Sequence, residues 1–68
     1  MREDFLSWCR DQRRIAGERC ERLETGKMVV FDQRGREPRR DVSAEWAEEL
    51  RREVAYLDRV IAIMEQGV

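Results

Sequence analysis

The two cysteines, Cys9 and Cys20, carry the most reactive side chains of a chain that contains no histidine. A thiol serves as a nucleophile or a zinc ligand when a histidine or a second cysteine stands close by, as in a Cys-x-x-Cys pair. On one helix these cysteines lie about 16 Å apart, beyond the roughly 7 Å between Cα atoms that a disulfide allows. We therefore expect two reduced, buried thiols, no metal and no cofactor.

The remaining polar residues do not form a catalytic pattern. The neighbouring carboxylates Glu48 and Glu49 fit a solvated helix face, and the "TGK" at residues 25–27 lacks the glycine spacing of a phosphate-binding loop. Without histidine, the commonest general base is missing as well. The sequence predicts a protein that is not an enzyme and has no small-molecule substrate.

Basic residues gather between two charge-rich segments. Residues 27–41 hold five bases and three acids, whereas residues 42–68 hold three bases and six acids, and the whole chain has a net charge of −1. The candidates for contact with a protein partner or with DNA phosphates are Lys27, Arg34, Arg36, Arg39 and Arg40. Alternatively, these side chains are solvated residues that keep a strand edge from pairing with another sheet.

Apolar periodicity predicts two helices that flank this basic segment. The first spans about residues 2–24 and stops at Gly26; its apolar stripe is Phe5, Trp8, Cys9, Ile15, Ala16, Cys20 and Leu23. The second spans about residues 44–65, with Ser43 as its N-cap; its stripe is Trp46, Leu50, Val54, Leu57, Ile61 and Met64. We expect both tryptophans to pack in the core; the alternative is that a tryptophan at a partly exposed position anchors an interface.

The second helix carries more apolar residues than one stripe can bury. Tyr56, Val60, Ile63 and Met64 are therefore the candidates for an interface with another subunit or a partner. This excess has two explanations, which are self-association of the coiled-coil type and docking to a larger protein.

Between the helices, residues 27–41 predict a β-hairpin. "KMVVF" has strand composition, Gly35 suits the turn, and "EPRRDV" gives a return strand that Pro38 confines to an edge. Either Met28 and Val30 or Val29 and Phe31 would cover the helix pair. Residues 1–68 thus form one small α+β domain of α-β-β-α order, with no apolar run near the roughly 18 residues of a membrane span and no signal peptide in its charged first residues.

In this order of elements, the "TGK" stop, the "RGR" turn and the helix "AEWAEELRREVAYLDRVI" resemble the gpW family of head-to-tail joining (head-completion) proteins of tailed bacteriophages. The resemblance covers roughly residues 12–62. It implies two antiparallel helices packed on a β-hairpin, and copies that form a ring under the portal on assembly and bridge to the neck or tail. It also implies a place in the virion neck, and in the host cytoplasm during assembly.

The resemblance makes Lys27, Arg34 and Arg36 candidates for contact with the portal or the DNA channel, and it assigns the second helix to subunit contacts. We therefore expect a structural connector with portal, neck and tail proteins as partners and non-specific contact with packaged DNA. The acidic second helix of one copy could pair with the basic hairpin of the next. The alternatives are a small regulatory or inhibitory protein that binds one target through the second helix, and a DNA-binding accessory factor that uses the basic hairpin.

Overall fold

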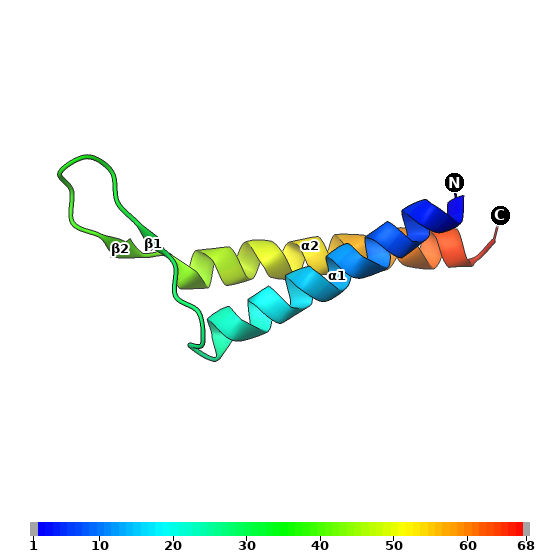
Figure 1. Cartoon of the computed structure of the whole chain (residues 1–68), viewed down its shortest axis with the longest axis horizontal. Helices are drawn as coiled ribbons and strands as arrows, with labels where there is room; N and C mark the ends of the chain where they lie inside the picture. Colours follow the sequence, from blue (N-terminus) through cyan, green and yellow to red (C-terminus); the bar gives the residue numbers. More distant parts are fainter. Residues whose placement is uncertain (1, 68) are drawn as a thin grey trace.

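The computed structural model describes residues 2–67, which form two long helices joined by a short β-hairpin (Figure 1). The elements are α1 (Arg2–Glu24), β1 (Phe31–Asp32), β2 (Arg40–Asp41) and α2 (Ser43–Glu65). The predicted α-β-β-α order is confirmed, and both helices match their predicted spans to within one residue. The helices lie antiparallel, with the chain ends at one end of the molecule and the hairpin at the other, in a shape of 52 × 25 × 15 Å. Neither described helix is long and apolar enough to cross a membrane.

A thin core lies between the helices in two clusters. Near the chain termini, Cys9 packs with Leu57 and Ile61, and Leu6 and Val60 cover this cluster. Near the hairpin, the buried residues are Cys20, Leu23 and Ala47, covered by Met28, Val30 and Leu50. Because only two helices and one connector enclose these residues, much of each helix surface stays open.

The prediction that both tryptophans pack in the core is wrong. Trp8 and Trp46 are each about half exposed, at 54% and 53%, as is Phe5 at 50%. The core line of each helix instead passes one residue further along the chain, through Cys9 and Ala47, so that the tryptophans lie on its flank.

The connector after α1 turns at Gly26, which has a φ of 78° and donates its N–H to the carbonyl of Leu23. A left-handed residue just past a helix end satisfies terminal carbonyls in this way. From there, Met28 and Val30 point into the second core cluster, while Val29 and Phe31 are about half exposed. Of the two arrangements that the sequence left open, the one with Met28 and Val30 on the helices is correct.

The hairpin has less regular strand than the sequence predicted. Phe31 pairs with Asp41 and Asp32 with Arg40, and residues 27–30 and 37–39 are not strand. Residues 33–39, named here the basic loop, join the strands, with Gly35 at a φ of 56°. The pair projects beyond the helices instead of lying flat on them (Figure 1), so few side chains stabilise a longer ladder.

Ser43 is not the N-cap of α2, because the helix already includes it and Val42 takes the N-cap position without a side-chain hydrogen bond. Asp41 supplies the missing acceptor: its carboxylate receives the backbone N–H of Ser43 at 2.9 Å. The Ser43 hydroxyl receives the N–H of Val30 at 2.9 Å and so ties the connector to the helix.

Candidate functional site: two docking surfaces

The two faces of the helical layer differ in character, and position relative to the core decides which residue lies on which face. In an antiparallel helix pair, residues that directly follow core residues on both helices share one face, and residues that directly precede them share the other. Ion pairs join the helices on the first of these faces. They are Arg10 with Glu65 at 2.7 Å, Glu24 with Arg51 at 3.0 Å, and Arg13 with Asp58.

The second face carries apolar side chains at the same spacing. The positions directly before core residues include Phe5, Trp8, Ile15, Tyr56, Val60 and Ile63, a set named here the apolar face. Its rings include a stacked pair, Phe5 and Trp8, with centroids 6.0 Å apart. A surface of this kind, larger than scattered single apolar residues, is typical of a protein interaction site.

The four interface residues expected from the sequence are placed differently from one another. Tyr56 and Ile63 are open to solvent, with 60% and 64% of their surface exposed. Val60 is half-buried against the Cys9 cluster, and Met64 is half-buried on the core side of α2. Tyr56 and Ile63 are thus available to a partner, whereas Val60 and Met64 mainly complete the chain's own packing.

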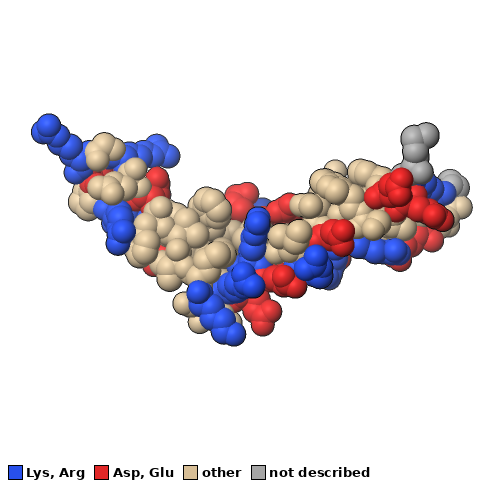
Figure 2. All heavy atoms as spheres, viewed as in Figure 1, with Lys and Arg blue, Asp and Glu red and all other residues tan. Residues whose placement is uncertain are grey.

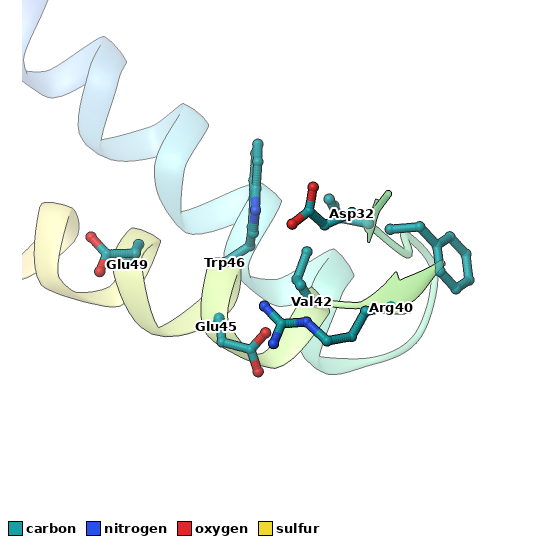
Figure 3. A pocket seen from close by; sticks show the side chains of 8 residues that line it. Asp32, Arg40, Val42, Glu45, Trp46 and Glu49 are labelled. Atoms are coloured by element: carbon teal, nitrogen blue, oxygen red, sulfur yellow. The ribbon is translucent and has the colours of Figure 1, made fainter. Parts of the chain in front are cut away.

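A groove runs along α2 from the hairpin to Tyr56. It consists of two adjoining hollows of about 350 and 570 Å³, which share Trp46 and Glu49. We call it the Trp46 groove; its lining residues are Val30, Phe31, Asp32, Arg40, Val42, Glu45, Trp46, Glu49, Leu50, Arg52, Glu53 and Tyr56. In Figure 3 the Trp46 ring stands up from α2 beside Asp32, and Arg40 extends from β2 toward Glu45.

Another hollow of about 760 Å³ lies where the helices separate near the hairpin, on the side of the ion pairs. It is lined by three carboxylates, Glu24, Asp41 and Glu48, and by one base, Arg51, which pairs with Glu24 at 3.0 Å and with Glu48 at 2.5 Å. Unlike the Trp46 groove, this hollow has no aromatic side chain among its lining residues.

The five basic candidates do not form one patch. Lys27 lies in the connector at the end of α1, whereas Arg34 and Arg36 lie in the basic loop (Figure 1). Arg34 is 3.5 Å from the carboxylate of Asp32, and the Arg39 guanidinium stacks over Phe31 at 4.4 Å from the ring centre. In Figure 2 the basic side chains at the hairpin end point in several directions, an arrangement that suits separate protein contacts better than one DNA backbone.

The cysteines are both buried and both free. Cys20 is the more polar site, because its sulfur lies 2.8 Å from a carboxylate oxygen of Glu24 and 3.5 Å from the Ala47 carbonyl. The hydrogen bond to Glu24 and burial raise the pKa of this thiol, which favours the unreactive protonated form. Within residues 2–67 no group of three or more potential metal ligands is found.

The sequence does not predict two parts of these surfaces. The apolar periodicity places Phe5 and Trp8 on the core stripe, and it does not predict the Trp46 groove. The available signal was the second apolar line, offset by one residue from the core line on each helix, with aromatic residues in it.

Comparisons of the chain with protein-family models, with curated proteins and with solved structures give no match.

Proposed function

We propose that this protein is a structural, non-enzymatic connector that works by docking, as the head-to-tail joining proteins of tailed bacteriophages do. Copies would sit as a ring below the portal of a phage head and bridge to the neck or tail. The observation that supports this proposal best is the apolar face, because a monomer gains nothing from leaving these side chains in water. The α-β-β-α order agrees with it.

The size of the apolar face favours docking within an assembly over tight pairwise binding. Four members of the apolar face, Phe5, Trp8, Tyr56 and Ile63, are at least half exposed. They offer roughly 400 Å² of apolar area, if each large side chain covers about 150–250 Å² when buried. At about 25 cal/mol per Å², burial of that area contributes about 10 kcal/mol. Association costs an estimated 4–15 kcal/mol, so one such contact leaves little net affinity. Several weak contacts made at once in a ring would bind firmly.

An affinity purification from cells that produce the assembled particles tests this function. Tagged protein should recover portal and neck proteins, and the variant Ile63→Arg should lose them while Ala62→Arg keeps them. Ala62 is an exposed neighbour that follows a core residue, so it lies on the opposite face. Recovery of one soluble enzyme or repressor, with no particle component, would instead support the regulatory function through the same face.

A further inference from the structure

The Trp46 groove combines aromatic surface with unbalanced negative charge. Its carboxylates are Asp32, Glu45, Glu49 and Glu53, and its bases are Arg40 and Arg52, so four negative and two positive charges leave −2. Glu49 pairs with Arg52 at 3.1 Å, but the ion pairs found among residues 2–67 do not include Glu53. Trp46, which both hollows share, and Tyr56, at the end away from the hairpin, are each more than half exposed.

The basic loop carries the opposite charge. Arg34, Arg36 and Arg39 outnumber Glu37, so residues 33–39 have a net charge of 3 − 1 = +2. The side chain of Arg34 is 84% exposed, and its distance of 3.5 Å to Asp32 makes the ion pair a loose one. Arg39 already stacks on Phe31, which shows that an arginine of this loop packs against an aromatic ring.

We propose that the Trp46 groove binds the basic loop of a second copy of this chain. Arg34 or Arg36 of the second copy stacks on Trp46 and pairs with Glu49 or Glu53 of the first. Within its own chain the loop meets the groove at Asp32, through Arg34, because the paired strands direct the loop away from the helices (Figure 1). A guanidinium, with its planar face and fork of N–H donors, satisfies a ring and a carboxylate together.

A contact between two different surfaces of the same chain repeats from copy to copy, and closes into a ring or grows as a chain. The proposal therefore deepens the connector function by assigning the contact between neighbouring copies. Exposed ion pairs bind weakly, so free protein should associate only at high concentration and low salt. On a template that holds copies side by side, the same contact would form readily.

Two charge-reversal variants of the full chain test the contact without any other component. The loop variant carries Arg34→Glu and Arg36→Glu, and the groove variant carries Glu49→Lys and Glu53→Lys. Sedimentation at about 1 mM protein and low salt should show that the natural chain self-associates. In each variant alone, the association constant should fall at least about tenfold. The double control Glu21→Lys and Arg59→Glu, at exposed positions outside both surfaces, should associate like the natural chain.

Mixing the two variants gives the decisive result. The reversed loop now meets the reversed groove and the natural loop meets the natural groove, so association should return, as it should in a chain that carries all four changes. In NMR spectra of the isotope-labelled loop variant, the indole N–H signal of Trp46 should shift when the unlabelled groove variant is added. An unshifted Trp46 signal, or variants that self-associate as strongly as the natural chain, would overturn the proposal. Because no portal, neck or tail protein is present, this outcome is independent of the affinity purification.

Discussion

At the scale of single residues, Cys20 shows how closely the small core couples burial to charge. Its thiol lies in the cluster with Leu23 and Ala47, yet reaches the carboxylate of Glu24 at the edge of that cluster. The same contact and the ion pair with Arg51 lower the pKa of Glu24, so the thiol stays protonated beside a stable carboxylate. One side chain thus joins the apolar core to the ion pairs.

Alkylation of Cys20 should therefore require a higher pH than alkylation of an unfolded thiol, since only the thiolate reacts. The change Glu24→Gln should move the pH midpoint of the reaction downward, because a neutral amide no longer disfavours the thiolate, while burial of the sulfur stays the same. Iodoacetamide labelling followed by peptide mass spectrometry over roughly pH 7–10 measures this midpoint. Equal midpoints in the two proteins would contradict the role given to Glu24.

Replacement of Gly17 by alanine should stabilise the fold. Gly17 lies inside α1, and an added Cβ would meet nothing within 4 Å, so the glycine serves no close approach. The change Gly17→Ala should raise the free energy of unfolding by about 1 kcal/mol, which is the helix propensity difference. Urea unfolding measures it. The matched change Gly26→Ala should have the opposite effect and cost about 1–2 kcal/mol, because Gly26 has a positive φ. Destabilisation by Gly17→Ala would show a contact that this structure lacks.

At the scale of elements, the junction between β2 and α2 controls how the hairpin meets the helices. Asp41 accepts the N–H of Ser43, and the Ser43 hydroxyl accepts the N–H of Val30. These two bonds join strand, connector and helix within a few residues. Hydrogen bonding to Ser43, through its side chain and its backbone N–H, lowers the pKa of the Asp41 carboxyl.

A carboxyl whose pKa is lower in the folded state stabilises the fold above its unfolded pKa, near 4, and loses this effect as the pH falls. Asp41→Asn should therefore lower the free energy of unfolding at neutral pH and flatten its decline between about pH 5 and 2. Urea unfolding at a series of pH values measures both effects. As a control, Glu37→Gln in the basic loop should leave the neutral-pH value unchanged. A decline as steep in Asp41→Asn as in the natural chain would refute this assignment.

The sequence predicts the elements well because each depends on local signals. Helix periodicity, Gly26 after the first helix and Gly35 in the turn all act over a few residues, and the fold has them as expected. Which apolar line faces the partner helix is not local. On α1, Phe5 and Trp8 repeat with the same period as Leu6 and Cys9, so periodicity alone cannot separate the two lines. The N-cap prediction is wrong by one residue, because Val42 takes that position and Asp41, two residues before Ser43, supplies the acceptor.

At the scale of the whole molecule, the surface divides by chemical character. Ion pairs occupy one face of the helical layer, and the apolar face lies opposite. The basic loop projects from the end of the molecule (Figure 1). An elongated molecule with distinct surfaces at its side and its tip suits contacts with several neighbours at once. This division supports the proposal of a connector, in which the apolar face meets other particle proteins and the loop meets the next copy.

Substitution on the apolar face should separate assembly from folding. Ile63→Arg should change the free energy of unfolding by no more than about 0.5 kcal/mol, because most of the Ile63 surface is already in water. Ala62→Arg, on the opposite face, should be equally mild. Thermal unfolding of both proteins checks this expectation, and a loss of several kcal/mol in Ile63→Arg alone would mean that Ile63 belongs to the core.

Electron microscopy of the particles made by producing cells tests the central claim most directly. Cells that lack this protein should accumulate heads without tails, Ile63→Arg should give the same particles, and Ala62→Arg should restore complete ones. Complete, tailed particles made in the absence of the protein would contradict the connector function.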